Sequence, residues 1–568
     1  MRFLTAAILF VVSAMLILVG IAQKTVWHPA PSHTQTISVT DKTPLIIIKH
    51  EALAHFDSTP VVSVSGSDKS FIGFGRQADV DSWVGSTKHV EITSSGSEND
   101  LKLTSKAFAG TGKLGSPLGS DLWRRETTAT GPATIKVPLA QRAAVLIASD
   151  GFASAPNQIT ITWPISFNPV PSNILIIAGA VLMFAALVVN IWAWYNMRKL
   201  RGPRRRTPRA PQGPRLGRRR STRSSAPGRG RRSARNLSVA VTGALMVASL
   251  AGCSVAPDAK ASSTSTAATS IQQPPVATMG QVKNIVNRVA TAIAAADASH
   301  DSKALDERAA GPAFAARKAH YILQKASKKV DALPPIPTKI LSLTLPAASN
   351  LWPRSIMVIT SNGGSESLPQ MLVLQQKSPR SQYKLWYDID MLPGAKLPVV
   401  NTAAVGAIPI ASDSLFLKIA PNALPAAFGD LIDNGTSSLS AASFDVSNDE
   451  YYKQVYASQQ SQISNLSNAT IKNKHFLADP NVISLSTVNS GALVAVFMND
   501  KYVIKPKNNT QAVAVAGDEK LMLGAAGSTT GVKSIYGTML LFYVPAIASK
   551  DKIVTLGATQ QLLSVKAQ

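Results

Sequence analysis

Cys253 is the only cysteine in the 568-residue chain, and its sulfur is the one side-chain atom that could carry a thioether-linked lipid. It directly follows Leu250, Ala251 and Gly252, at the end of an apolar stretch that begins at Leu237. A single cysteine cannot form an intrachain disulfide or complete a cysteine-rich zinc site. The thiol of Cys253 therefore takes part in neither of these structures.

Residues 237–253 have the parts of an export signal, with a basic region, a short apolar core and small residues before the cysteine. Leu250-Ala251-Gly252-Cys253 resembles the lipobox of bacterial lipoproteins. The resemblance implies diacylation of the Cys253 sulfur and cleavage of the bond between Gly252 and Cys253. The alternative is a third, short membrane span with an incidental cysteine. Fusion of a membrane protein to a lipoprotein would explain a lipobox in mid-chain.

Three other motifs suggest chemistry, but their spacing argues against it. His50 and His55 are five residues apart, about 140° around a helix, whereas a zinc-binding helix needs a spacing of four. The stretch also looks more like a strand. Gly73 to Ala78 matches a dinucleotide fingerprint without a βαβ context, so we interpret it as a glycine turn between strands. Gly110 to Lys113 is followed by Leu114, which cannot hold magnesium as Ser or Thr would.

No nucleophile, base and acid can be grouped from the sequence, which has eight histidines in all. We therefore expect no catalytic residue, no metal site and no cofactor. Side chains that are distant in sequence can still converge in the fold. What the sequence does indicate about function is which segments cross the membrane and on which side of it the others lie.

Two apolar stretches are long enough to cross a bilayer, which takes about 20 residues. Leu4 to Ala22 predicts an uncleaved anchor within residues 1–27, with a cleaved signal as the alternative. Ile174 to Trp194 predicts a transmembrane helix over residues 174–195. Aromatic residues end this second span and basic residues follow it, so its C-terminal end should face the cytoplasm.

From Asn196 to Arg235 the chain has 16 Lys and Arg residues and no acidic residue, out of a formal net charge of +26. Such a segment cannot bury apolar surface, so residues 196–236 are predicted to be a disordered tether. Basic residues near a membrane attract anionic lipid by about 1 kcal/mol each. We expect Arg198 to Arg235 to contact anionic headgroups. Nucleic-acid binding is the less favoured alternative, because the tether has no aromatic residue for base stacking.

These features predict a protein of the cytoplasmic membrane. Residues 23–173 and 254–568 should lie outside and residues 196–236 inside. With the third apolar segment, the chain would have two to three transmembrane helices.

Residues 36–168 contain short strand-like runs separated by Gly, Ser, Asp and Pro, which predicts an exported all-β sandwich. The sequence from Phe71 to Trp83 resembles that of actinobacterial membrane proteins in which a β-rich ectodomain lies between membrane helices. Ser120 to Trp123 and Ala148 to Gly151 fit the same pattern. The resemblance covers roughly residues 40–195 and implies no activity.

The remaining chain predicts an α+β exported region. Residues 254–280 are a Ser/Thr/Ala/Pro-rich linker, and residues 401–444 connect two segments, 281–400 and 445–568, in which helical patterns precede strand-like runs. This order resembles two NTF2-like or cystatin-like cones of helices and a curved antiparallel sheet. The resemblance implies a cavity, for which the candidate lining residues in the first unit are Tyr321, Trp352, Trp386 and Tyr387.

The sequence thus favours a multi-domain, membrane-anchored envelope protein with a non-enzymatic binding or assembly role. An envelope protein or a glycan is the expected partner. The first alternative is an enzyme that acts on cell-wall glycans in an NTF2-like cavity, although no pair of carboxylates for hydrolysis can be identified. The second is binding of nucleic acid or anionic lipid by the basic tether.

Overall fold

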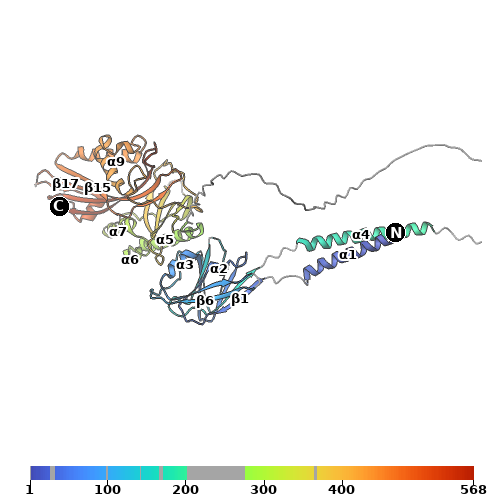
Figure 1. Cartoon of the computed structure of the whole chain (residues 1–568). Coiled ribbons are helices and arrows are strands. Elements are labelled where there is room, and N and C mark those ends of the chain that lie inside the picture. The colour runs from blue at the N-terminus through green and yellow to red at the C-terminus, as the bar shows by residue number, and fades with distance from the viewer. Residues whose placement is uncertain are drawn as a thin grey trace, which may run out of the picture. The chain divides into compact units, whose positions relative to one another are not determined.

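The computed structural model describes residues 2–25, 32–97, 100–140, 142–164, 170–200, 275–363, 368–508 and 510–568 (Figure 1). The chain divides into two compact units, one with residues 1–28 and 168–270 and one with residues 29–167 and 271–568. The predictions for residues 201–274 lie outside the described residues. They concern most of the basic tether, the segment with Leu250 to Cys253, and most of the linker.

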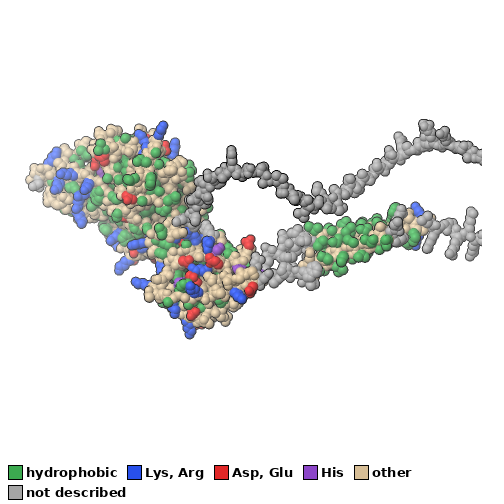
Figure 2. All heavy atoms as spheres, in the orientation of Figure 1, with side chains coloured by type: hydrophobic (Ala, Val, Ile, Leu, Met, Phe, Trp, Pro, Cys, Tyr) green, Lys and Arg blue, Asp and Glu red, His purple; other side chains and the backbone are tan. Residues whose placement is uncertain are grey.

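The first unit contains two helices, α1 (Arg2–Thr25) and α4 (Val170–Leu200). Within them, Leu4–Gln23 and Asn173–Lys199 are long and apolar enough to cross a membrane. Hydrophobic side chains cover the exposed surface of both helices (Figure 2). The two apolar stretches recognised in the sequence are therefore helices that could span a bilayer, which supports an association with membranes.

Small residues lie where α1 and α4 pack side by side (Figure 1). A Cβ atom added to Gly179 would lie 2.6 Å from Cγ1 of Ile17 and 3.0 Å from the carbonyl oxygen of Ser13. Small residues let helix backbones approach closely, which favours helix pairs in lipid. The buried small residues recur every seven positions: Ala6, Ser13 and Gly20 on α1, and Gly179, Ala186 and Ala193 on α4.

Residues 32–164, here called the β domain, form two sheets that share one hydrophobic core. The first sheet has the order β1 (Ser32–Ser38), β10 (Gln158–Pro164), β3 (Val61–Ser65), β8 (Ala133–Lys136). The second has the order β6 (Lys102–Phe108), β5 (His89–Ser95), β2 (Leu45–Ile48), β9 (Ala143–Ala148), β4 (Lys69–Arg76), β7 (Arg125–Thr130). In the second sheet β2 and β5 are parallel, and the other pairs are antiparallel.

The second sheet is buried on both faces, so every residue of β2 and β9 is buried. One face meets the first sheet in the shared core. The other face packs against helix α3 (Gln77–Val84), against Leu122 and Trp123, and against Trp352 from the C-terminal part of the chain. A layer beyond the two sheets therefore covers this side.

Two local predictions for the β domain are wrong. Gly73 and Gly75 do not form a turn between strands but lie within β4. A Cβ on Gly75 would be 3.0 Å from the carbonyl oxygen of Leu122, so the glycines allow residues 122 and 123 to approach the strand. His50 begins a short helix, α2 (His50–Leu53), rather than lying in a strand.

Residues 275–568, here called the C-terminal domain, begin with three helices followed by four antiparallel strands. Thr278 and Gln281 form a capping box at the start of the first helix. Apolar residues recur at helical spacing on one face of this helix and are buried: Val282, Ile285, Val286, Val289 and Ile293. The elements are α5 (Met279–Ser299), α6 (Ser302–Leu305), α7 (Gly311–Ala326), β11 (Lys339–Pro346), β12 (Arg354–Ser361), β13 (Gln370–Gln376) and β14 (Lys384–Asp390), with the strands in chain order.

The second half of this domain also places helices before antiparallel strands. Its sheet has the order β15, β17, β20, β21, and β16 pairs with β17. The helices are η1 (Pro421–Ala423), α8 (Leu424–Asn434), η2 (Gly435–Ser437), η3 (Ala441–Ser443), α9 (Glu450–Asn465) and α10 (Gly517–Leu523). The strands are β15 (Ala469–Leu477), β16 (Ile483–Ser486), β17 (Ala492–Pro506), β18 (Val513–Ala514), β19 (Gly527–Ser528), β20 (Val532–Val544) and β21 (Val554–Ala567).

The sheet β15–β17–β20–β21 lies between two cores. Leu493, Ala495 and Phe497 of β17 belong to a core shared with α5, α7 and β11–β14. On the opposite face, Val494 and Val496 belong to a core with α8 and Phe444. The two halves therefore pack as one body, and the connector at residues 401–444 contributes α8 to its core.

Candidate functional site

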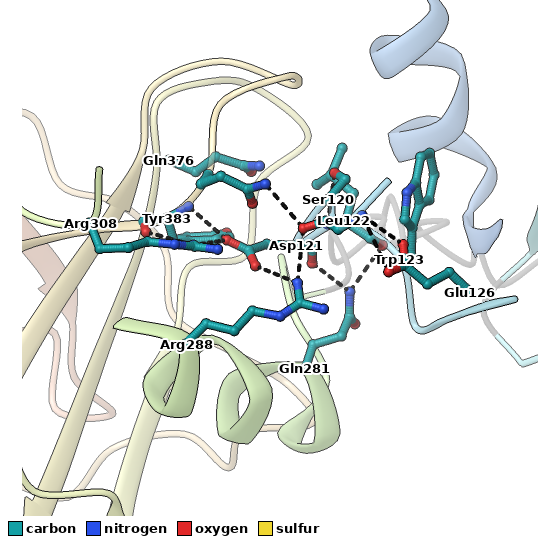
Figure 3. A network of polar contacts seen from close by, with 12 residues as sticks. Ser120, Asp121, Leu122, Trp123, Glu126, Gln281, Arg288, Arg308, Gln376 and Tyr383 are labelled. Carbon is teal, nitrogen blue, oxygen red and sulfur yellow. Dashed lines mark hydrogen bonds and ion pairs between the residues drawn. The ribbon is translucent and has the colours of Figure 1, made fainter. Parts of the chain in front are cut away.

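A buried carboxylate, Asp121, joins the β domain to the C-terminal domain (Figure 3). Its Oδ2 accepts hydrogen bonds from Arg308 Nη1 at 2.7 Å and from the backbone N–H of Tyr383 at 2.8 Å. Its Oδ1 accepts one from Arg288 Nη1 at 3.1 Å. The Asp121 side chain is fully buried and that of Arg308 is 7% exposed. One carboxylate thus binds α5, the segment between α6 and α7, and the residue before β14 together.

The backbone around Asp121 is held by amide side chains of the C-terminal domain (Figure 3). Gln281 Nε2 donates to the carbonyl oxygens of Asp121 and Leu122 at 3.3 and 3.1 Å. Gln382 Nε2 donates to the carbonyl oxygen of Gly119 at 3.0 Å. The Gly119 N–H in turn donates to Glu126, whose pKa is raised by burial. The loop therefore presents fixed acceptors to the other domain.

A second buried carboxylate, Asp79 at the start of α3, makes an equivalent connection. Arg76 Nε and Nη2 of the same domain donate to it at 2.8 and 2.7 Å. Arg354 Nη1 of β12 donates to it at 2.7 Å, and the Arg354 side chain is completely buried. Burial lowers the pKa of Arg354, and pairing with Asp79 opposes that shift. The Arg354 guanidinium also lies 3.5 Å from the ring centre of Trp352.

Arg380 fixes the end of α3 from the C-terminal domain. Its Nε donates to the carbonyl oxygen of Trp83 at 2.7 Å, and its guanidinium lies 4.5 Å from the centre of the Trp83 ring. It also donates to the Thr87 hydroxyl at 2.7 Å and to the carbonyl oxygen of Lys113. We refer to the contacts of Asp79, Asp121 and Arg380 together as the domain interface.

The energetics of the domain interface follow from burial. Removing one partner of a buried ion pair leaves an uncompensated charge and costs about 3–5 kcal/mol. Such pairs also oppose mismatched partners, because a wrong surface would leave the carboxylates unpaired. The arrangement can recognise a surface that supplies arginines at fixed positions.

Both carboxylates lie in segments that the sequence resemblance singled out. Asp79 is in the stretch from Phe71 to Trp83, and Asp121 is in Ser120 to Trp123. Arg288, Arg308 and Arg354, which contact these carboxylates, and Arg380, which contacts the end of α3, carry no local signal beyond their charge, so the sequence did not identify them. Leu250, Ala251, Gly252 and Cys253 lie outside the described residues.

A second candidate site is a cavity of about 450 Å³ in the C-terminal domain, here called the tyrosine cleft. Val494 and Val496 of β17 lie in the core on one face of the sheet. The cleft lies on the same face toward the C-terminal end of β17, where Asp500 and Tyr502 follow these apolar residues. The lining residues are Tyr451, Gln454, Val455, Ser458, Gln459, Gln462, Ile471, Tyr502, Ile504, Glu519, Tyr536, Ala558 and Gln560.

Beside the cleft the interior of the domain contains buried polar side chains: Asp500, Thr538 and Gln459. Asp500 accepts from His475 Nδ1 and from the Thr538 hydroxyl, both at 2.6 Å, and from Gln560 Nε2 at 3.1 Å. Gln459 Nε2 donates to Asp433 at 2.8 Å, while its buried Oε1 has no partner in the part of the chain that the structure describes. An unpaired buried amide oxygen is costly unless a ligand or water completes it.

His475 lies between two carboxylates behind the cleft. Its Nδ1 is 2.6 Å from Asp500, and its Nε2 forms a longer ion pair, at 3.3 Å, with Asp433. Burial lowers the pKa of His475, but the interactions with Asp433 and Asp500 outweigh that effect and raise the pKa to about 9. The imidazole is therefore protonated at neutral pH.

The cleft is not where the sequence placed a cavity. Tyr321 donates to Asp297 at 2.5 Å and Tyr387 donates to the carbonyl oxygen of Asn481, so both hydroxyls serve the interior of the domain. Trp386 packs against Gly311, and Trp352 belongs to the domain interface. None of these four residues lines the tyrosine cleft. The cleft belongs to the second half of the domain, where glutamine side chains of α9 line it.

The comparisons with known proteins concern the C-terminal domain. No curated protein and no solved structure matches the chain. Residues 273–567 match the family described as Domain of unknown function (DUF8094), and this match covers more than half of the 568 residues. The chain therefore belongs to the DUF8094 family.

Proposed function

We propose that this protein is a membrane-anchored cell-envelope protein with a non-enzymatic binding or assembly role at the outer face of the cytoplasmic membrane, where its β domain and C-terminal domain act as one body. The observation that carries the proposal is the pair of buried carboxylates, Asp79 and Asp121, that receive arginines from the C-terminal domain. A buried charge is costly unless it is paired and hydrogen-bonded, so each domain needs the other to satisfy these groups. The two domains are therefore the obligate partners of one another.

The lipobox and the basic tether fit this proposal as parts of the anchor. The two apolar helices hold the β domain to the membrane, and Arg198 to Arg235 contact anionic headgroups on the cytoplasmic side, without nucleic acid. If the chain is cleaved before Cys253, two acyl chains anchor the C-terminal domain stably where one would not. The domain interface then keeps the two pieces together. The helices-then-strands order of each half supports the NTF2-like likeness, which is part of the proposal.

The proposal predicts that the two domains stay together when the chain between them is cut. A protease site placed among residues 254–274 is cleaved in the detergent-solubilised full-length protein, and the C-terminal piece is purified through a tag at its end. We expect residues 1–253 to co-purify with it, because the buried ion pairs are only weakly screened by salt. Separation of the pieces at micromolar concentration and moderate salt would contradict the proposal.

A second candidate function, glycan binding in the tyrosine cleft, is favoured by the composition of its lining. Tyrosine rings, glutamine amides and Ser458 line the cleft with a single carboxylate, Glu519, and no basic residue. Aromatic faces and amides suit the apolar faces and hydroxyl groups of a sugar, and a volume of 450 Å³ is in the range of ligand sites. Hydrolysis would need two carboxylates that flank the bond, so we propose binding rather than cleavage.

Calorimetry with the full-length protein tests the glycan site, using chitotriose, maltotriose and a trisaccharide of uronic acids. We expect one of the uncharged sugars to bind and the acidic one to be excluded by Glu519. Tyr502→Ala should weaken binding about tenfold, because a contact worth ~1.4 kcal/mol is lost. Tyr387→Phe, which removes a buried hydroxyl outside the cleft, is the matched control. Equal binding by the wild type and Tyr502→Ala would exclude the cleft as the site.

A further inference from the structure

One face of the sheet β15–β17–β20–β21 carries a cluster of basic residues that the functions above do not use. In the register of the sheet, Lys472 lies opposite Val503, Val503 opposite Lys533, and Lys533 opposite Lys566. Directly opposed residues point to the same side of a sheet. We call this set the lysine face: Lys472, Lys474, Lys501, Lys505, Lys533 and Lys566.

The lysine face lies beyond the core that covers the rest of that side of the sheet. Leu493, Ala495 and Phe497 of β17 are in the core shared with the first half, and Lys501 and Lys505 follow on the same side of the strand. Lys and Arg side chains gather at the end of the domain where β15, β17 and the C terminus lie (Figures 1 and 2). The opposite side of these strands forms the tyrosine cleft.

The positions of these lysines lower the stability of the sheet when no ligand is bound. Lys474 lies directly opposite Lys501, and like charges in that position destabilise a sheet. Among the described residues, no acidic side chain forms an ion pair with any of the six lysines. Edge strands use lysines to prevent sheet pairing, but Lys501, Lys505 and Lys533 are on the inner strands β17 and β20. Protection of an edge therefore does not explain them.

The surface between these lysines is hollowed. A cavity of about 380 Å³ is lined by Thr470, Lys472, Asn473, Lys474, Lys501, Val503, Lys505 and Gln568. The lining includes four lysines and no acidic side chain, and its other polar side chains are the hydroxyl of Thr470 and the amides of Asn473 and Gln568. Lysine ammonium groups are compact point charges that bind phosphate oxygens well. A groove of this composition selects a ligand with several negative charges.

The shape of the site distinguishes between polyanions. Lys472 and Lys474 are two residues apart on one strand, a separation of about 7 Å, so they can contact successive charges along a chain. A flat bilayer surface would meet the rim of a groove rather than its interior, and no large exposed apolar side chain lines it for insertion among lipids. Nucleic acids bound as single strands require aromatic stacking, which this lining does not provide.

We propose that the lysine face binds a linear polymer with repeated phosphodiester or phosphate groups, held in the groove between Lys472, Lys474, Lys501 and Lys505. The ligand neutralises the opposed lysines and so stabilises the second half of the C-terminal domain. This site is independent of the domain interface and of the tyrosine cleft.

Binding of the full-length protein in detergent to poly(glycerol phosphate) and to inorganic polyphosphate tests the proposal. The test variant replaces Lys472, Lys474, Lys501 and Lys505 by Gln. The control variant replaces four lysines that are exposed elsewhere in the domain, also by Gln: Lys303, Lys325, Lys328 and Lys329. Both variants lose the same charge and keep the basic tether, so their difference reports the lysine face alone.

We expect the test variant to bind roughly a hundredfold more weakly than the control variant, and the slope of log K against log salt to become less steep by roughly 3. The polymer should raise the thermal midpoint of the wild type and the control variant only. Without ligand, the test variant should be at least as stable as the wild type, because the opposed charges are removed. Equal binding by the two variants would overturn the proposal. So would lysine-face-dependent binding to phosphatidylglycerol vesicles without binding to either polymer.

Discussion

Replacing Asp121 by alanine should weaken the association of the cut domains by roughly 10²–10⁴-fold, because Arg308 is then buried without its counter-charge, a loss of about 3–5 kcal/mol. The measurement is the dissociation constant of the two pieces after cleavage among residues 254–274. Asp79→Ala should have an effect of similar size, since it leaves Arg354 unpaired in a fully buried position.

Two further variants separate a lost ion pair from a general loss of structure. Adding Arg308→Met to Asp121→Ala should restore part of the affinity, because no buried charge is then left without a partner. Asp100→Ala removes an exposed carboxylate that pairs with Lys102 at 3.8 Å and should change the constant by less than about threefold. An Asp121→Ala protein whose pieces bind as tightly as the wild type would show that the interface does not hold them together.

The stability of the C-terminal domain should fall as the pH rises from about 6.5 to above 9, because the folded state holds a proton on His475. The pKa of His475 is about 9 in the folded protein, above its ordinary value of 6.5. A raised pKa stabilises the fold fully below the unfolded value and loses this contribution as the pH rises through the folded value. The difference corresponds to about 3 kcal/mol, or several degrees in the thermal midpoint of the domain.

His475→Gln should be less stable than the wild type at pH 6 and should show little of this fall, since glutamine does not titrate. Asp433 and Asp500 are the charged groups that face the imidazole, and the Tyr502 ring packs edge-on against it. His320→Gln is the control, because the His320 ring makes a single exposed contact with the carbonyl oxygen of Asp331. Thermal unfolding of the full-length protein between pH 6 and 9.5 measures both. An identical pH dependence in His475→Gln would refute the assignment.

Much of the fold was predictable where one periodicity dominates. The two apolar stretches, the strands at Leu45–Ile48 and Ala143–Ala148 and the buried face of α5 follow directly from the pattern of apolar residues. β2 and β9 are apolar at every position, whereas a strand of a two-sheet sandwich needs apolar residues only on the face that meets the core. A strand that is apolar at every position is typical of a sheet covered on both faces. The second cover is α3 together with the C-terminal domain.

The domain interface was not predictable, because its partners are far apart in the chain. Asp121 and Arg308 are separated by 187 residues, and no local pattern links them. The tyrosine cleft was missed for a related reason. In α9 the apolar Ile463 is 42% exposed, while the polar Gln459 is buried beside the cleft. Helical periodicity alone does not distinguish an amide in solvent from one that lines a cavity.

Cross-linking in intact cells of the native host tests the central claim most directly, namely that the two domains pair on the outer face of the membrane. A membrane-impermeant, lysine-reactive reagent is added to cells, and linked peptides are identified by mass spectrometry. Lys113 and Lys377 are exposed on opposite sides of the domain interface, near Arg380, which contacts the Lys113 backbone. Links between Lys102 and Lys106 and between Lys325 and Lys329 serve as controls within each domain. We expect the Lys113–Lys377 link together with both control links. The two control links without the Lys113–Lys377 link would contradict the pairing of the domains. No link in intact cells but all three links after lysis would contradict their position on the outer face.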